Sequence, residues 1–251
     1  MENTVRLARR GGPAGCRSGG REWVLTRTEG EIATNTDPTG SWSLVVPLKP
    51  LARAKSRLGR AVGAERPRLA LAFAQDTVSA ALSCPAVRDV VVVTDDPVAG
   101  AALAALGART VADVPAAGLN AALEHGVRSA RADRPDAAVA ALNADLPALR
   151  PSELARVLDF AAAFPRTFLA DAQGIGTTFL SAASGVELRP FFGGPSRARH
   201  LASGAVEVPP AGLDSVRRDV DTGEDLRVAL ALGAGHRTTA LCAPAAGRAC
   251  G

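Results

Sequence analysis

The sequence predicts an α/β fold in which a doubly wound, parallel β-sheet is covered by helices. Two observations carry this prediction. Short valine-rich segments alternate with longer segments that have apolar residues at helical spacing, a pattern typical of parallel strands joined by right-handed crossovers. The segment 89–94 (DVVVVT) has four consecutive valines, as a central strand buried on both faces requires. At 251 residues and 47% apolar composition, the chain is long enough for one or two domains.

The first four strand and helix pairs follow one another without interruption. The first helix has Leu69, Phe73, Val78 and Leu82 on one face, at the spacing of an amphipathic helix. Glycine favours a helix end and serine a helix start, so Gly107 should end the second helix and Ser152 should cap the fourth. The predicted strands are 43–48, 89–94, 108–113 and 136–143, and the predicted helices are 65–83, 99–107, 118–131 and 150–163.

The pattern changes after residue 165. Short strands are predicted at 166–171, 177–182 and 205–210, with helices at 196–203 and 223–233. This region could be a small insertion or an extension of the sheet, and we assign it to the same domain, residues 41–235. Residues 1–40 are rich in Gly, Thr and Arg and show no sustained periodicity, which predicts a disordered extension. Residues 236–251 are predicted to form a C-terminal tail.

The composition excludes several classes of protein. The net charge is +4, but only 4% of the residues are aromatic and tyrosine is absent, so the stacking surfaces of a nucleic-acid-binding protein are not expected. The four cysteines are widely spaced and form no C-x-x-C pair, which argues against a disulfide scaffold or structural zinc. No apolar run reaches the length of a membrane helix and no secretory signal is visible. We therefore expect a cytoplasmic protein that binds small anions and neither nucleic acid nor membranes.

Charged residues follow the predicted strands at the edge where α/β sheets bind ligands. Basic residues follow the first strand, and acidic residues follow the second and fourth strands and precede the last helix. Basic and acidic groups at neighbouring strand ends predict a polyphosphate site with a divalent cation, because Mg²⁺ binds one or two carboxylates together with phosphate oxygens. The residues concerned are Lys49, Arg53, Lys55, Arg57, Asp95, Asp96, Asn143, Asp145, Asp219 and Asp221.

Lys49 and Lys55 are the only lysines among 29 basic residues. A lysine offers phosphate a compact charge without the planar geometry of a guanidinium, which would explain why arginine does not replace it here. The alternative is that both lysines lie on a solvated surface. Asp145 and Asp221 also have an alternative role, since each could cap a turn or helix.

Two glycine-rich segments, DAQGIGTTFL and FFGGPSRARH, could bring the backbone close to a phosphate or carboxylate. The alternative is that they are ordinary turns with a serine cap. His125 and His200 are expected to be structural or exposed. No G-x-S-x-G, Walker A or G-x-G-x-x-G motif is present, which argues against serine hydrolases and the commonest kinases and dehydrogenases.

Seven segments, in this order, resemble the guanylyltransferases of coenzyme F420 biosynthesis, which act on phosphoenolpyruvate or 2-phospho-L-lactate. They are VVPLKPLARAKSRL, VTDDP, GLNAALEHG, NADLPAL, DAQGIGTT, FGGPSRARH and DVDTGEDL. The resemblance covers residues 42–230. It implies a Rossmann-like nucleotidyltransferase fold of three α/β/α layers with a mostly parallel mixed sheet. In DVDTGEDL, Gly223 stands where the family usually has proline.

The resemblance also implies which residues form the site. Asp145 and Asp221 would hold Mg²⁺, and Thr178, Gly193 and Ser196 would bind phosphoenolpyruvate. The doubled residues leave open whether the threonine is Thr177 or Thr178 and whether the glycine is Gly193 or Gly194.

The implied reaction transfers GMP from GTP to phosphoenolpyruvate and yields enolpyruvoyl-2-diphospho-5'-guanosine and pyrophosphate. Lys55, with Lys49 and Arg57, would stabilise the charge on the departing pyrophosphate. Gly118 and Asn120 would contact the nucleoside, and the product could pass to the next enzyme of the pathway.

Three alternatives remain open at this point. The same reaction could use 2-phospho-L-lactate or 3-phospho-D-glycerate. The chain could act on a molybdenum-cofactor precursor, although PLKPLARAKS lacks the glycine-rich loop expected there. It could also be a non-catalytic nucleotide-binding regulator, against which the presence of both aspartates argues.

Overall fold

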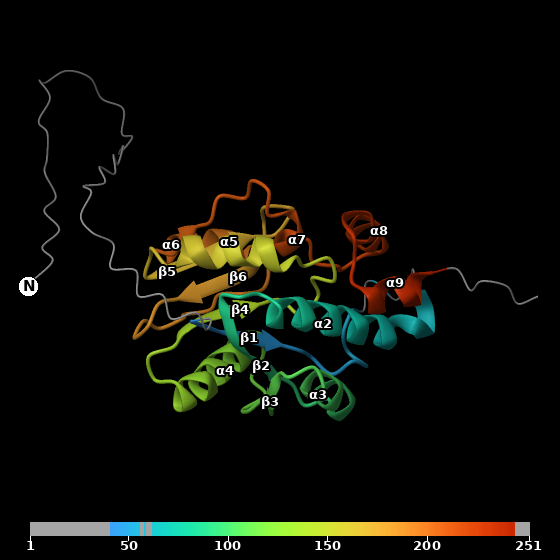
Figure 1. Ribbon diagram of the computed structural model, residues 1–251, viewed down its shortest axis with the longest axis horizontal. Coiled ribbons are helices and arrows are strands. Elements are labelled where there is room, and N and C mark those ends of the chain that lie inside the picture. Colours follow the sequence, from blue (N-terminus) through green and yellow to red (C-terminus); the bar gives the residue numbers. More distant parts are fainter. Residues whose placement is uncertain (1–40, 56–57, 59–61, 244–251) are drawn as a thin grey trace, which may run out of the picture. The chain divides into compact units, whose positions relative to one another are not determined.

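The computed structural model describes residues 41–55, 58 and 62–243. The predicted N-terminal extension, residues 1–40, and the end of the predicted tail lie outside the described residues. The structure contains a seven-stranded sheet with the strand order β3-β2-β1-β4-β6-β5-β7 (Figure 1). The strands are β1 (Trp42–Pro47), β2 (Val87–Val93), β3 (Arg109–Val111), β4 (Ala138–Leu142), β5 (Arg166–Ala170), β6 (Thr177–Ala182) and β7 (Val206–Glu207).

The sheet is mixed, and its antiparallel part comes from the region after residue 165. Strands β1, β2, β3 and β4 pair in parallel, while β6 runs antiparallel to both β4 and β5, and β7 pairs in parallel with β5. This region therefore extends the sheet and is not a separate insertion. The predicted α/β class with a mostly parallel mixed sheet is confirmed.

The six predicted helices are present in the predicted order, with differences at their ends. The helices are η1 (Gly63–Glu65), α2 (Arg66–Leu82), α3 (Pro97–Ala104), α4 (Leu119–Asp133), α5 (Pro151–Ala161), α6 (Ser196–Ala202), α7 (Asp214–Arg217), α8 (Gly223–Leu232) and α9 (His236–Cys242). Of these, η1, α7 and α9 were not predicted. The predicted cap at Ser152 is wrong, because α5 already begins at Pro151 and has Arg150 as its N-cap. None of the helices in the described part is long and apolar enough to cross a membrane.

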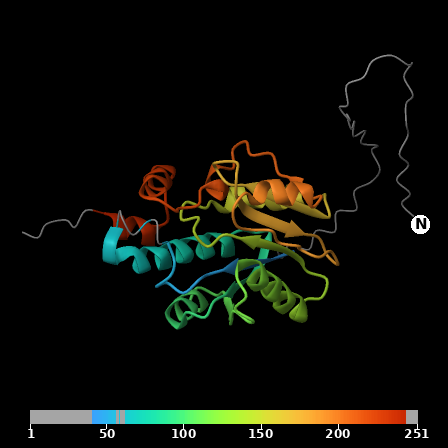
Figure 2. The same cartoon turned by 180° about the vertical axis from the view of Figure 1, so that it is seen from behind.

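Two apolar cores lie on opposite faces of the sheet, because successive side chains of a strand point to opposite faces. Leu44 and Val46 of β1 pack into one core with α2, α3 and α5. Val45, between them, packs into the other core with α4. Figures 1 and 2 show the sheet and its helices from opposite sides. The valine-rich strands are buried on both faces, as predicted for the centre of the sheet.

Helix α9 extends the packed structure beyond residue 235, where the predicted domain ends. The backbone N–H groups of Arg237 and Thr238 at its start donate to the buried Asp76 carboxylate of α2, at 3.3 and 2.8 Å. A Cβ atom at Gly235 would lie 2.3 Å from Cγ of Asp76, so this approach requires glycine. The sequence pattern did not predict the helix because its partner lies far away in the chain.

Helix α4 packs against β1 and β2 more closely than a side chain at position 126 would allow. A Cβ atom at Gly126 would lie 2.4 Å from Cγ1 of Val45 and 2.7 Å from Cγ2 of Val93. Both valines are fully buried, so neither has free space into which it can move.

We predict that Gly126→Ala destabilises the protein although alanine favours helices. Overpacking costs about 1–3 kcal/mol and helix propensity returns about 1 kcal/mol, so the free energy of unfolding should fall by up to about 2 kcal/mol. Gly100→Ala in α3 is the matched control: its Cβ would lie 3.8 Å from the Thr94 side chain, and the change should stabilise by about 0.5–1 kcal/mol. Urea unfolding measures both. Equal effects of the two changes would contradict the close packing of α4.

Candidate active site

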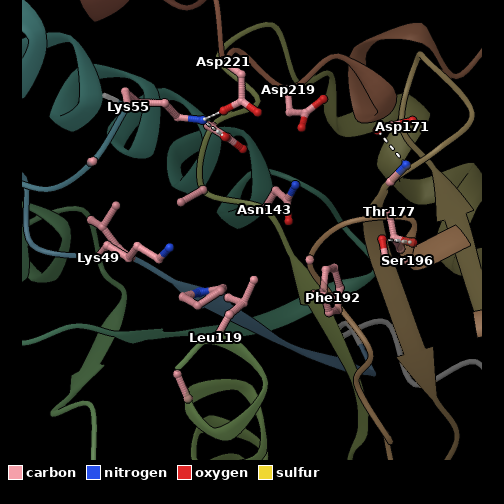
Figure 3. A pocket seen from close by; sticks show the side chains of 18 of the residues that line it. Lys49, Lys55, Leu119, Asn143, Asp171, Thr177, Phe192, Ser196, Asp219 and Asp221 are labelled. Atoms are coloured by element: carbon pink, nitrogen blue, oxygen red, sulfur yellow. Dashed lines mark hydrogen bonds and ion pairs between the residues drawn. The ribbon is translucent and has the colours of Figure 1, made fainter. Parts of the chain in front are cut away.

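A cavity of about 670 Å³ opens at the carboxyl ends of β1 and β4, a size typical of ligand sites. Loops after β1, β4 and β5 line it, together with the segment before α8 (Figure 3). Because β6 runs antiparallel to β4, its amino end lies at this same edge. The cavity therefore collects residues from both the parallel and the antiparallel parts of the sheet.

Lys55 lies between two carboxylates at one side of the cavity. Its Nζ atom donates to Oδ1 of Asp221 at 2.7 Å and also to Oδ2 of Asp145 (Figure 3). The Lys55 side chain is only 12% exposed. Burial alone would lower the pKa of Lys55, but the two carboxylates raise it above its usual value. The lysine is therefore charged at neutral pH and is not one of the solvated surface lysines of the alternative interpretation.

Backbone contacts bring the two aspartates together. The N–H group of Val220 donates to the carbonyl oxygen of Asp145 at 3.1 Å, which joins the segment after β4 to the segment before α8. Thr222 is the N-cap of α8 and forms a capping box with Asp225. Asp221 is consequently not needed as a cap, and its carboxylate faces the cavity. Helix α8 begins at Gly223 in spite of the missing proline.

The loop that holds the lysines is fixed from outside the cavity. The Arg66 guanidinium donates to the carbonyl oxygens of Leu51, Ala52 and Ala54. Asp96 accepts from the N–H group of Leu51 at 2.8 Å while it caps α3, and the backbone N–H groups lower its pKa. Asp96 is thus a structural support of the site rather than a cavity residue.

The backbone of Lys55 adopts a conformation that non-glycine residues rarely take. Its φ is 56°, in the left-handed region, which costs about 1–2 kcal/mol for a residue with a side chain. Strained residues of this kind cluster at functional sites, where surrounding contacts hold them.

Asp219 adds a third carboxylate to this side of the cavity. Burial, followed by the charges of Asp145 and Asp221, raises its pKa to about 7. Asp219 is among the charged residues predicted at this edge of the sheet, and its spacing from Asp221 agrees with this position, since alternate residues of an extended segment point the same way.

The carboxylates fit a divalent cation that shares its coordination with a ligand. Oδ1 of Asp145 is buried without a hydrogen-bond partner among the described residues, and the neighbouring Lys55 shows that the position stabilises positive charge. In the described part of the chain, no group of three or more Asp, Glu, His or Cys side chains is arranged to hold a metal by itself. Phosphate oxygens and water would therefore have to complete the coordination, as is usual for Mg²⁺.

Hydroxyl groups and glycines line the opposite side of the cavity. Thr177, Gly193, Gly194 and Ser196 all face it, and the Ser196 hydroxyl donates to Oγ1 of Thr177 at 3.0 Å (Figure 3). Thr178 does not line the cavity: it is fully buried, and its hydroxyl has no partner among the described residues. Consecutive residues of a strand point to opposite faces, so the structure places Thr177 in the cavity in place of Thr178.

Of the two predicted nucleoside contacts, Gly118 lies in the cavity lining and Asn120 does not. Gly118 lines the cavity, together with Leu119. The side-chain amide of Asn120 instead accepts from the Phe192 N–H group at 2.9 Å and donates to its carbonyl oxygen at 3.3 Å. Asn120 thereby fixes the glycine-rich segment against α4 and is not among the residues that line the cavity.

The basic residues predicted for the site lie in the cavity lining, except for Arg57, which the structure does not describe. Lys49 and Arg53 line the cavity with Lys55, and Lys49 points into it from the end of β1 (Figure 3). Arg57 lies outside the described residues, so its predicted role stays a prediction.

Comparison with known proteins identifies the relatives of this chain. The family described as "Guanylyl transferase CofC like" matches residues 42–241. A Streptomyces avermitilis protein named phosphoenolpyruvate guanylyltransferase is 69% identical over 203 residues, which cover 80% of this chain and 94% of that protein. A Thermomonospora curvata protein with the same name is 60% identical over 212 residues, covering 84% and 93%.

Solved structures share the fold at low sequence identity. A nucleotidyl transferase from Methanothermobacter superposes with a TM-score of 0.55 at 24% identity, over 76% of this chain and 97% of that chain. A putative nucleotide-diphospho-sugar transferase from Desulfovibrio desulfuricans also gives a TM-score of 0.55, at 16% identity, over 77% and 97%. The predicted nucleotidyltransferase type of α/β fold is confirmed.

We predict that Lys55→Met destabilises the ligand-free protein because it leaves the carboxylates without their cation. Breaking a buried ion pair costs about 3–5 kcal/mol. The Asp221 side chain is 51% exposed, so we expect a smaller loss of about 1–3 kcal/mol. Adding Asp145→Asn should recover part of it, since one unpaired charge is removed. Urea unfolding in the presence of a chelator tests this.

The matched control is Lys49→Met, which replaces the exposed lysine of the pair and should leave the free energy of unfolding within about 0.5 kcal/mol. If the two lysine variants are equally stable, the ion pairs of Lys55 do not hold the cavity wall together.

Proposed function

The chain belongs to the family of CofC-like guanylyl transferases, and from this membership we propose that it transfers GMP from GTP to phosphoenolpyruvate in coenzyme F420 biosynthesis. The family predicted from the sequence motifs is confirmed. The products would be enolpyruvoyl-2-diphospho-5'-guanosine and pyrophosphate.

One observation in the structure carries this proposal: the ammonium group of Lys55 joins Asp145 and Asp221 at one side of a cavity whose other side presents hydroxyls and glycines. A site with charges of both signs on one side suits a polyphosphate and its cation. The side with the hydroxyls and glycines suits a small acid whose oxygens accept hydrogen bonds. The Asp171 carboxylate on this side accepts from the backbone N–H groups of Ile175 and Gly176. GTP supplies the polyphosphate, and phosphoenolpyruvate supplies the small acid.

The reaction needs little covalent chemistry from the protein. An oxygen of the acceptor phosphate attacks the α-phosphorus of GTP, and the bond from that phosphorus to the oxygen bridging to the β-phosphate breaks. The electron pair of this bond leaves with pyrophosphate. The acceptor phosphate is already ionised at neutral pH, so no general base is required, and catalysis consists of positioning and charge stabilisation.

The cationic side chains have a defined task in this reaction. Lys55 and Lys49 would stabilise the negative charge that develops on the leaving pyrophosphate, with Arg53 nearby in the lining of the cavity. Arg57 would join them if it lies on the same side. Gly118 and Leu119, at the start of α4, would contact the nucleoside.

Asp145 and Asp221 are the residues that would hold Mg²⁺. When bound, this ion supplies neutralisation of charge on the reacting phosphates. Asp219 lies next to them, and because its pKa is about 7 its ionisation would set the net charge of the three carboxylates near neutral pH.

Thr177, Ser196 and the backbone of Gly193 or Gly194 would bind the acceptor. Phosphoenolpyruvate, 2-phospho-L-lactate and 3-phospho-D-glycerate all have a phosphate and a carboxylate, so the lining alone does not separate them. We choose phosphoenolpyruvate because the relatives compared above bear its name. Mass spectrometry of the product formed from GTP with each acid tests the choice. A guanylylated product from another acid alone, or from none of the three, would overturn it.

We predict that Asp145→Asn lowers guanylyl transfer by about a hundredfold or more, since a metal interaction is worth several kcal/mol in the transition state. Pyrophosphate release with GTP and phosphoenolpyruvate measures the rate. The matched control is Asp159→Asn, at an exposed position of α5, which should keep the parent rate. Equal rates for both variants would show that Asp145 holds no metal.

We also predict that Lys55→Arg slows the reaction by about tenfold or more, a loss of about 1.4 kcal/mol of transition-state stabilisation. The change keeps the charge, but the planar guanidinium is larger than the compact ammonium group and directs its donors differently, so it would not reproduce the contacts of Lys55 with the two carboxylates and the phosphates. Measuring turnover at saturating GTP and phosphoenolpyruvate tests this. Unchanged turnover would remove the explanation for a lysine at this position.

A further inference from the structure

His200 of α6 is a buried histidine whose two ring nitrogens both have partners beside the acceptor side of the cavity. The ring is fully buried, and the aromatic rings of Phe168, Phe191 and Phe192 surround it with centroid distances of 5.6, 6.1 and 5.2 Å. The ring therefore has a fixed orientation. The reaction proposed above does not use it.

The backbone decides which nitrogen of His200 carries the proton. The N–H group of Phe191 donates to Nε2 at 3.0 Å, and a backbone N–H group cannot accept, so Nε2 is unprotonated. Burial, followed by the charges of Arg166 and Arg199, lowers the pKa of His200 to about 4, so the ring is neutral at neutral pH. The single proton is consequently on Nδ1, which lies 2.9 Å from Oγ1 of Thr177.

This tautomer fixes the direction of the Thr177 hydroxyl. A hydroxyl has one proton to donate and two lone pairs that can accept. In Thr177 both lone pairs are used, because Nδ1–H of His200 and the Ser196 hydroxyl both donate to Oγ1. The Thr177 proton then has no acceptor in the described part of the chain. Thr177 lines the cavity, where an oxygen of a bound acid could accept from it.

We propose that His200 is a positioning residue for the acceptor: its Nδ1–H holds the Thr177 hydroxyl so that the hydroxyl donates to a phosphate or carboxylate oxygen of the bound acid. This inference rests on the proposed function of the cavity. A fixed, buried donor selects for an oxygen at one place, since a ligand without it leaves the donor unpaired. The hydrogen bond from His200 to Thr177 thus affects binding of the acceptor acid and does not affect binding of GTP.

The tautomer can be tested without any substrate. The chain has three histidines, His125, His200 and His236, so ¹⁵N NMR of the imidazole rings, assigned with His200→Gln and His125→Gln, resolves each one. We expect His200 to show a protonated Nδ1 and an unprotonated Nε2 in the ligand-free full chain at pH 7. Protonation at Nε2, or at both nitrogens, would overturn the inference.

Steady-state kinetics tests the proposed hydrogen bonds from His200 to Thr177 and from Thr177 to the acceptor acid. His200→Phe and Thr177→Val should each raise the KM for phosphoenolpyruvate about tenfold, the effect of one hydrogen bond of ordinary strength, and leave the KM for GTP within about twofold. His200→Gln, whose amide can both donate and accept, should recover part of the loss. The double variant should be no worse than Thr177→Val alone, because both changes remove one interaction.

His125→Gln is the matched control, at a partly exposed position of α4, and should not change either KM. Additive effects of His200→Phe and Thr177→Val on the KM for phosphoenolpyruvate, or an equal rise in the KM for GTP, would contradict the proposed role of His200. The two proposals fail in different ways. If no acid is guanylylated, the proposed function fails while the NMR result stands. If product forms but Nε2 is protonated, only the role of His200 fails.

Discussion

The ion pairs of Lys55 with Asp145 and Asp221 are the interaction on which the rest of the cavity depends. They join residues 90 and 166 positions apart in the chain, and they hold the loop after β1 against the segments that follow β4 and precede α8. Opposite charges in a partly buried place attract strongly enough to fix three loops. The same arrangement can receive the charges of a polyphosphate and its cation, so the contact that organises the site also suits its ligands.

The antiparallel strand β6 gives the cavity its second side, which presents hydroxyl groups. A purely parallel sheet would present only strand ends followed by loops at this edge. The reversal of β6 brings the start of a strand, with Thr177, next to the carboxyl end of β4. Strand residues are held by the sheet on both sides, so a hydroxyl placed there is more rigid than one on a loop. One side of the site is thus held by ion pairs between loops, and the other is held by hydrogen bonds.

Several polar residues around the cavity support it without entering it. Arg66 and Asp96 hold the lysine loop, Asn120 fixes the backbone of Phe192, and His200 fixes the hydroxyl of Thr177. Of these residues, Asp96, Asn120 and His200 stand in the same motifs as cavity residues. Part of each motif therefore encodes the orientation of its neighbours, because a binding group must be held by a second layer of contacts to act at a defined place.

The sequence by itself determined the order of the strands and of six helices, the strand ends at which charged residues gather, and the family. These depend on periodicity and on short motifs, which are local properties of a chain. The tertiary structure decided which of the adjacent threonines faces the cavity, that Asn120 bonds to Phe192, that α9 packs on α2 through Asp76, and that Lys55 lies between Asp145 and Asp221. Each of these depends on a contact between residues far apart in the chain, and local patterns do not encode the distance or direction of such contacts.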